Sequence, residues 1–247
     1  MIKNVGIFTM QSQLLLDNLN ERLFITADPQ FGSHRLFKYI GERRRFGSMK
    51  SLHDSLVENW NASVRDDDVI LCLGDFTQNM QNKKKSMKLI EKYTPRLNGR
   101  KLLIRGNHDV EDTCWYYDFG WTCLVEYPLI ILDGRMEWLS VPSQYCGCIV
   151  ADIAGRRILF SHFAIFEDDA RDRRYIVEKA FLRKLFSDYR CNINIHGHTH
   201  LREVDDIRCH SACVEHLAFS PVRLGDFLQD RVPSVTGNAA KPLSLLA

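Results

Sequence analysis

The chain has 247 residues, of which 45% are hydrophobic and 26% charged, and its formal net charge is +2. This is the composition of an ordinary globular protein, and the near-neutral charge gives no overall field that favours nucleic acid or a membrane. No run of 18 apolar residues and no signal peptide is recognised. We therefore expect no membrane span, and a cytoplasmic protein whose eight cysteines are reduced thiols.

Five short apolar runs, each ending in a polar turn, predict buried strands. They cover residues 23–27, 69–73, 101–105, 157–160 and 192–195. Between them, apolar residues at helical spacing predict helices within residues 49–64, 86–93 and 173–189. Strands that alternate with helices indicate a layered α/β architecture, in which ligands collect at the carboxyl ends of the strands.

The polar residues at these strand ends are carboxylates, amides and imidazoles, which bind divalent metals of intermediate hardness. They are Asp28 and Gln30, Asp75, Asn107 and His108, His162, and His198 and His200. A single ion cannot use so many ligands, whereas two ions can if a carboxylate such as Asp75 bridges them. The pattern therefore predicts a two-metal site suited to displacement at phosphorus.

In chain order, the motifs at the strand ends are D-P-Q, G-D-F, G-N-H-D, S-H-F and G-H-T-H. This series resembles the calcineurin-like metallophosphoesterase superfamily, over residues 23–224, and other segments are similar to its small phage and bacterial branch. The resemblance implies a four-layer αββα sandwich with two central mixed β-sheets. It divides the chain into an N-terminal extension (1–21), a metallophosphoesterase domain (22–230) and a C-terminal tail (231–247).

The resemblance also implies a role for each matching residue. The ligands of a first ion are Asp28, Gln30, Asp75 and His200, and those of a second ion are Asp75, Asn107, His162 and His198. His108 matches the residue that contacts the phosphate and protonates the leaving oxygen, and Asp109 would orient it. His108, Asp109 and Asn107 thus form the expected catalytic set, in which a metal-bound hydroxide attacks a phosphate ester, a diester more readily than a monoester.

Gln30 departs from the family pattern, which has histidine at this position. An amide oxygen is a harder and weaker donor than imidazole, so it should weaken the first site and shift it away from zinc. We expect two divalent ions with Mn²⁺ favoured, and with Fe, Mg, Zn, Ni or Co as alternatives. The second departure is F-G-S-H in place of F-G-H. It leaves His34 either as a contact to substrate phosphate or as a surface loop residue.

Two other functions stay open. The first is a phosphate-binding or protein-interaction module that has lost turnover, which Gln30 alone supports. The second is a structural zinc held by Cys209 and Cys213 beside His198 and His200. The zinc hypothesis leaves the other predicted metal ligands unused.

The remaining charged and histidine residues are expected to be ordinary. The clusters at 43–45, 83–85 and 171–174 are expected on the solvated surface, with one arginine of the last cluster available to an anionic substrate group. We expect His53 to face solvent. His196 is expected to be structural, and His210 and His216 to be ordinary strand residues.

The expected substrate is a phosphate ester, with nucleotides, small phosphodiesters and phosphoproteins all compatible, and binding to nucleic acid stays open. Selectivity is expected to lie in loops at 34–50 and 114–148.

Overall fold

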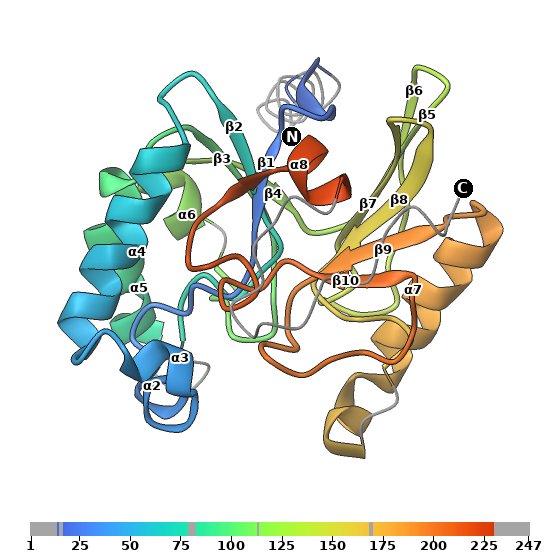
Figure 1. Cartoon of the computed structure of the whole chain (residues 1–247). Coiled ribbons are helices and arrows are strands. Elements are labelled where there is room, and N and C mark those ends of the chain that lie inside the picture. Colours follow the sequence, from blue (N-terminus) through green and yellow to red (C-terminus); the bar gives the residue numbers. More distant parts are fainter. Residues whose placement is uncertain (1–13, 15–16, 79–82, 113, 168–169, 230–247) are drawn as a thin grey trace.

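Two β-sheets lie face to face in the centre of the structure, and helices cover their outer faces (Figure 1). This computed structural model describes residues 14, 17–78, 83–112, 114–167 and 170–229, without the side chains of 123, 124 and 170–172. The predicted four-layer αββα sandwich is confirmed. Most of the predicted extension and the whole of the tail lie outside the described residues, so the predicted domain boundaries stay predictions.

The first sheet has the strand order β11-β1-β2-β3-β4. Its neighbouring strands are parallel except β11, which pairs antiparallel with β1. The strands are β1 (Phe24–Thr26), β2 (Val69–Cys72), β3 (Arg100–Ile104), β4 (Trp121–Val125) and β11 (Val222–Arg223).

The second sheet has the order β10-β9-β8-β7-β5-β6 and is also mixed, because β7–β8 and β5–β6 are antiparallel while the other pairs are parallel. Its strands are β5 (Pro128–Leu132), β6 (Arg135–Trp138), β7 (Cys148–Ile153), β8 (Arg156–Ser161), β9 (Ile193–His196) and β10 (Cys209–Ser211).

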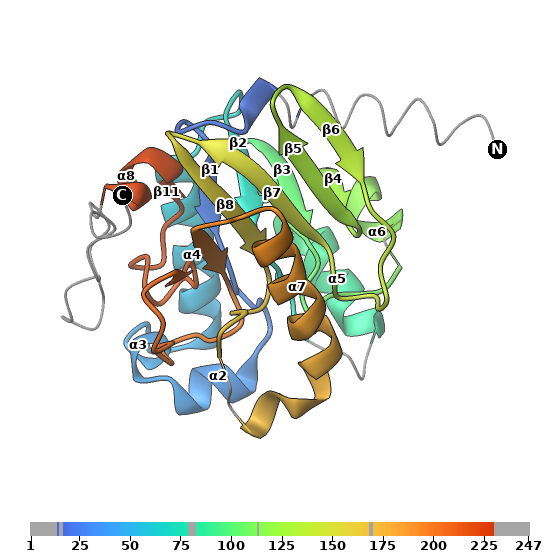
Figure 2. The ribbon, with the colours of Figure 1, turned by 90° about the vertical axis from the view of Figure 1, so that its right-hand side faces the viewer.

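Three longer helices cover the sheets: α4 (Met49–Ser63) and α5 (Lys83–Tyr93) lie on the first sheet, and α7 (Ile176–Asp188) lies on the second (Figures 1 and 2). The shorter helices are α2 (His34–Tyr39), α3 (Gly41–Arg44), α6 (Cys114–Asp118), α8 (Leu224–Leu228), η1 (Thr94–Arg96) and η2 (Ala170–Tyr175). Within the described part of the chain, every helix is too short or too polar to cross a lipid bilayer.

Successive side chains along a strand point to opposite faces of the sheet, so the strands contribute to three hydrophobic cores. Leu71 of β2 packs in the core between the two sheets, together with Phe160 of β8. The preceding residue of β2, Ile70, packs against α4 and α5, and Leu159 of β8 packs against α7. All four side chains are 0% exposed, and each such burial contributes about 1.5–3 kcal/mol. These cores fix both sheets, and with them the positions of the strand ends.

Two predictions about the surface are wrong. His53 is buried in α4, where its Nε2 accepts from the backbone N–H of Gly32 at 3.0 Å and its Nδ1 lies 2.9 Å from the hydroxyl of Tyr93. Arg43 of the first basic cluster is 0% exposed, whereas Lys83, Lys84, Lys85, Arg44, Arg45, Arg173 and Arg174 are exposed as expected. The segments 34–50 and 114–148, expected to be loops, consist largely of helices and strands, and their role in selectivity stays a prediction.

Candidate metal centre

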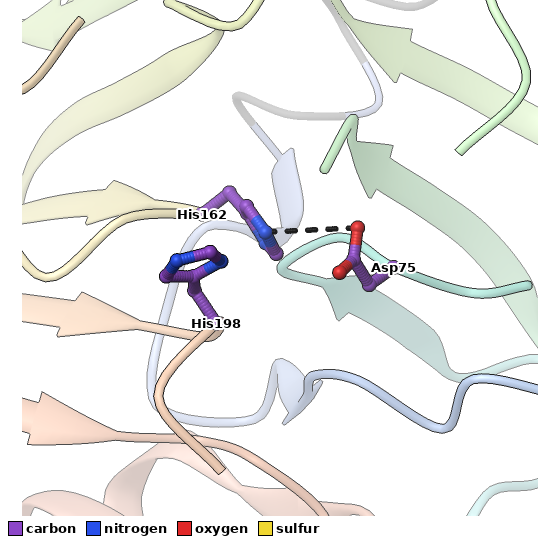
Figure 3. Close-up of side chains that lie close together, drawn as sticks. All are labelled: Asp75, His162 and His198. Atoms are coloured by element: carbon purple, nitrogen blue, oxygen red, sulfur yellow. Dashed lines mark ion pairs between the residues drawn. The ribbon is translucent and has the colours of Figure 1, made fainter. Parts of the chain in front are cut away.

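The predicted ligands come together where the carboxyl ends of the two sheets meet. Asp28, Asp75 and Asn107 follow β1, β2 and β3 of the first sheet, and His162 and His198 follow β8 and β9 of the second. Ligating atoms of Asp75, His162 and His198 all lie within 4.8 Å of one another. Figure 3 shows the two imidazoles on one side and the Asp75 carboxylate on the other. Segments distant in sequence thus form one site.

His162 presents a lone pair to the centre of this group. Its Nδ1 lies 2.8 Å from the backbone carbonyl of Leu73 and donates to it, so a neutral ring has its lone pair on Nε2. That Nε2 lies 3.0 Å from Oδ1 of Asn107 and 3.6 Å from Oδ1 of Asp75. Burial lowers the pKa of His162, which favours the neutral ring despite the nearby Asp28 carboxylate. Three electron-rich atoms therefore face one another.

This arrangement fits a divalent cation. Facing acceptors repel one another, and a divalent cation between them would relieve that repulsion. An imidazole nitrogen with carboxylate and amide oxygens is a common ligand set for such an ion. The Oδ1 of Asn107 faces His162, and its amide nitrogen is buried without a hydrogen-bond partner. The hydrogen bond from His162 to Leu73 orients the ring as second-sphere partners of metal ligands do. Asp75, Asn107, His162 and His198 would hold the ion.

Asp75 connects this group to the remaining ligands. Its side chain is 1% exposed. Its Oδ1 faces His162 and accepts from the backbone N–H of His108 at 2.7 Å, while its Oδ2 accepts from Nε2 of Gln30 at 2.9 Å. Burial raises the pKa of Asp75, although His108 opposes the rise. The carboxylate thus offers one oxygen to each half of the site, which is the geometry that the bridging prediction requires.

The other half of the site contains Asp28, Gln30 and His200. Asp28 is 0% exposed, and its Oδ2 accepts from the backbone N–H of His198 at 2.7 Å. Its Oδ1 lies 3.5 Å from Nε2 of Gln30 and 3.9 Å from Nε2 of His200. Burial raises the pKa of Asp28, whereas the nearby His200 lowers it. The amide of Gln30 lies between the groups predicted to hold the first ion.

The backbone at the site is held in a conformation that non-glycine residues rarely adopt. Five predicted ligands have positive φ: Asp28 (56°), Gln30 (43°), Asp75 (53°), His198 (70°) and His200 (50°). Each such residue costs on the order of 1–3 kcal/mol and persists where the surroundings enforce it, often at a functional site.

Two glycines allow the loops to approach the carboxylates. A Cβ at Gly106 would meet the Asp75 carboxylate, and one at Gly197 would meet that of Asp28.

A buried ion pair that the sequence analysis missed supports the first half. Nε of Arg43 donates to Oε1 of Glu215 at 2.6 Å, and its Nη2 donates to the backbone carbonyl of Asp28 at 2.7 Å. The same Glu215 oxygen lies 3.2 Å from Nδ1 of His200. Although burial opposes it, the charges of Arg43 and His200 hold the pKa of Glu215 far below its usual range. Glu215 therefore orients His200 as a carboxylate behind a metal-binding histidine does.

Asp109 ties two motif loops together. Its carboxylate accepts from the backbone N–H groups of Asp75 (2.7 Å), Phe76 (2.8 Å) and Gly106 (2.9 Å), and from the hydroxyl of Tyr116 (2.9 Å). Burial and the neighbouring Asp75 raise the pKa of Asp109 to about 6. These contacts position the loops that carry the ligands. The predicted contact of Asp109 with the His108 ring stays a prediction.

The three other histidines of the motifs differ in position. The side chain of His108 is 28% exposed, and its Nε2 lies 4.0 Å from Oδ2 of Asp75, at the edge of the site. His196 is buried in β9 with its Nδ1 2.8 Å from the carbonyl of Gly197, which suits a structural residue. His34 is exposed at the first position of α2.

The two cysteines predicted for a structural zinc have different neighbours. Sγ of Cys209 donates to Asn194 Oδ1, whereas Sγ of Cys213 is 3.4 Å from Oδ2 of Asp28. Over the described ranges, the His, Cys, Asp and Glu side chains close enough to share an ion are Asp75, His162 and His198. This group contains no cysteine, so the zinc hypothesis gains no support.

Comparison with known proteins gives the same picture. A sequence model of the calcineurin-like phosphoesterases matches residues 22–202. An uncharacterized protein of Methanocaldococcus jannaschii, MJ1445, is 34% identical over 88 residues, which are 36% of this chain and 47% of that protein. The chain thus aligns with about half the length of this relative. Because the family model covers most of the chain, the protein belongs to the calcineurin-like phosphoesterases.

One similar solved structure shares the fold. The protein of unknown function AQ665 from Aquifex aeolicus has a TM-score of 0.54 and 20% identity, with 81% of this chain and 94% of that chain covered. A novel archaeal phosphodiesterase has a TM-score of 0.35 and 15% identity, with coverages of 76% and 81%. At this level of identity, the Aquifex structure supports the fold alone.

Proposed function

We propose that the protein is a metal-dependent phosphoester hydrolase that cleaves a phosphodiester in preference to a monoester. The observation that carries the proposal is the convergence of Asp75, Asn107, His162 and His198, whose facing acceptor atoms would suit a cation. Two divalent ions, of which Mn²⁺ is favoured by the oxygen-rich ligands, would bind here with Asp75 between them. When bound, such ions activate water and neutralise charge on the phosphate.

The chain's own residues supply binding and proton transfer. His108 is at the edge of the ligand group with a partly exposed ring, so its Nε2 can reach a phosphate held beside Asp75. We assign it to protonate the leaving oxygen. The backbone N–H of His108 is bound to Asp75, so this histidine is positioned by the same carboxylate that joins the two halves. His34, exposed on α2, is a candidate contact for the rest of the substrate.

The substrate class in this proposal is a small phosphodiester, including nucleotides, and nucleic acid stays an option. A cytoplasmic location is part of the proposal, because the seven cysteines with described side chains are free thiols, five of them buried.

The test compares hydrolysis of bis(p-nitrophenyl) phosphate with that of p-nitrophenyl phosphate. Metal-stripped protein is titrated with Mn²⁺, and Asp75→Asn serves as the control. We expect Mn²⁺-dependent hydrolysis of the diester that is lost in the variant. Hydrolysis that does not depend on metal, or that persists in Asp75→Asn, would refute the assignment.

A phosphate-binding or interaction module without turnover is the second candidate, and the position of the Gln30 amide favours it. It predicts that Mn²⁺ binds but that neither ester is hydrolysed at any concentration of the ion.

A further inference from the structure

Gln30 occupies the place where the ligands of the first ion converge. Its side chain is buried, with 2% exposure. Its Nε2 lies 2.9 Å from Oδ2 of Asp75, 3.5 Å from Oδ1 of Asp28 and 3.4 Å from Nε2 of His200. All three residues are predicted ligands of that ion. One amide nitrogen therefore makes contacts that the first cation would make.

The direction of the amide follows from its neighbours. Ionised carboxylates only accept hydrogen bonds, so the NH₂ end of Gln30 must face Asp75 and Asp28. The opposite end, Oε1, is buried and has no hydrogen-bond partner. The atom that could bind a cation is thus turned away from the ligands, and the atom that faces them is a donor.

The second half of the site differs in the contacts that its described residues make. There, Nε2 of His162 faces the oxygens of Asn107 and Asp75 directly. The half of His162 therefore presents acceptor atoms to its centre. The half of Asp28 instead has the donor nitrogen of Gln30 between its ligands.

We propose that Gln30 is a latch on the first metal position, so that the two ions load in sequence. The ion that binds earlier occupies the half of His162, His198 and Asn107. The other position fills only when the amide of Gln30 turns and releases Asp28 and Asp75. The inference rests on the proposed metal-dependent function and adds the order and inequality of loading to it.

The expected inequality follows from the hydrogen bonds that the latch loses. A hydrogen bond to a charged acceptor accounts for about a tenfold change in binding. Release of the shorter bond to Asp75 and the longer bond to Asp28 therefore predicts that the ion beside Gln30 binds between about 10- and 100-fold more weakly than the ion beside His162. Unlike a merely poor ligand, a latch also makes a distinct prediction for its removal.

The test is a titration of the metal-stripped protein with Mn²⁺. Calorimetry measures the affinities, and electron paramagnetic resonance measures whether the bound ions are coupled. For the wild type we expect one tight ion with the spectrum of an isolated Mn²⁺. The spectrum of a spin-coupled pair should develop only with excess Mn²⁺. Two ions of equal affinity, with a coupled spectrum from the first additions, would overturn the proposal.

Variants separate a latch from a weak ligand. Gln30→Ala removes the donor without adding a ligand. A latch therefore predicts that the ion at the position of Gln30 binds more tightly than in the wild type. Weaker or unchanged binding of that ion would contradict it. Gln30→His adds an imidazole and should bring the two affinities within about tenfold of each other. Gln144→His, at an exposed glutamine, is the matched control and should bind as the wild type does.

Diester hydrolysis measured on the same samples keeps this inference distinct from the proposed function. Unequal loading without hydrolysis at either stage would support the latch and refute the hydrolase. Hydrolysis with two equally bound ions would do the reverse.

Discussion

The two halves of the metal centre share the Asp75 carboxylate and lie at the carboxyl ends of the strands. They differ in the atoms that face the centre of each half. In the half of His162 and Asn107, acceptor atoms face one another at 3.0 and 3.6 Å. In the half of Asp28, the amide nitrogen of Gln30 donates into the space between the ligands. The difference shows that two halves with matching ligand motifs can differ in whether every group facing the centre is an acceptor.

The halves also differ in their support. His162 is held by one bond to the carbonyl of Leu73 in the adjoining strand end. On the other side, His200 depends on Glu215, which is itself held by Arg43 from α3. The half with the amide thus depends on a longer chain of buried charged groups.

Asp75→Asn should have the largest effect, because this carboxylate supplies one oxygen to each half. The substitution keeps the shape but removes the charge, so we expect diester hydrolysis to fall further than with any other single change. Both ions should bind more weakly, as measured by calorimetry with Mn²⁺. If only one half lost its ion, the shared position of Asp75 would be wrong.

His108→Ala should reduce kcat by about 100- to 10,000-fold, which is the usual contribution of a positioned proton donor. Because the ring lies at the edge of the site rather than between the ligands, Mn²⁺ binding in both halves should stay unchanged. His34→Ala is the matched histidine control, for which we expect a change in KM and little change in kcat. Normal kcat in His108→Ala would remove it from the mechanism.

Arg43→Met tests the support of the first half. The change leaves Glu215 as a buried charge without its strongest partner, so we expect a loss of about 3–5 kcal/mol in the free energy of unfolding. Urea denaturation measures it, and exposed Arg44→Met should stay within about 0.5 kcal/mol of the wild type. Equal stability of the two variants would contradict the role given to Arg43.

We expect His53 to make a smaller, pH-dependent contribution to the free energy of unfolding. Its ring accepts a hydrogen bond from the backbone N–H of Gly32, close in sequence to Gln30. Burial, with the positive charges of Lys92 and Arg43, lowers its pKa from 6.5 to about 4. Below pH 6.5 the unfolded chain takes up a proton at His53, whereas the folded chain does so only near pH 4. Stability is therefore lost as the pH falls from about 6.5 to 4.

The expected loss from His53 is up to about 2 kcal/mol between pH 7 and pH 4.5, after allowance for partial solvent access. Urea unfolding at both values, compared with His53→Gln, isolates this contribution. A variant with the same pH dependence as the wild type would show that His53 does not titrate as described.

Much of the fold was accessible from sequence because it depends on local patterns. The five predicted strands agree with β1, β2, β3, β8 and β9 to within one residue at each end, since buried apolar runs end at polar turns. The predicted helices correspond to α4, α5 and α7. The segment 114–148 was expected to be a loop, whereas it forms α6, β4, β5, β6 and the start of β7.

The ligand group was predictable from the strand ends, but its supporting partners were not. Arg43 and Glu215 are 172 positions apart in sequence, and Arg43 lies in a run of three arginines that is typical of a surface. His53 looked solvent-facing because its bond to Tyr93 comes from another helix. The sequence pattern contains no signal for such pairs. The direction of the Gln30 amide also required coordinates, because it depends on Asp75 and His200 from other loops as well as on Asp28.

The most direct test of the metal centre is anomalous diffraction from crystals of the protein soaked in Mn²⁺. The account predicts a strong peak bounded by Asp75, Asn107, His162 and His198, and a weaker peak beside Gln30 that grows with the Mn²⁺ concentration. Crystals without a peak bounded by Asp75, Asn107, His162 and His198, or with the ion bound away from these residues, would contradict the central claim that this site binds a catalytic metal.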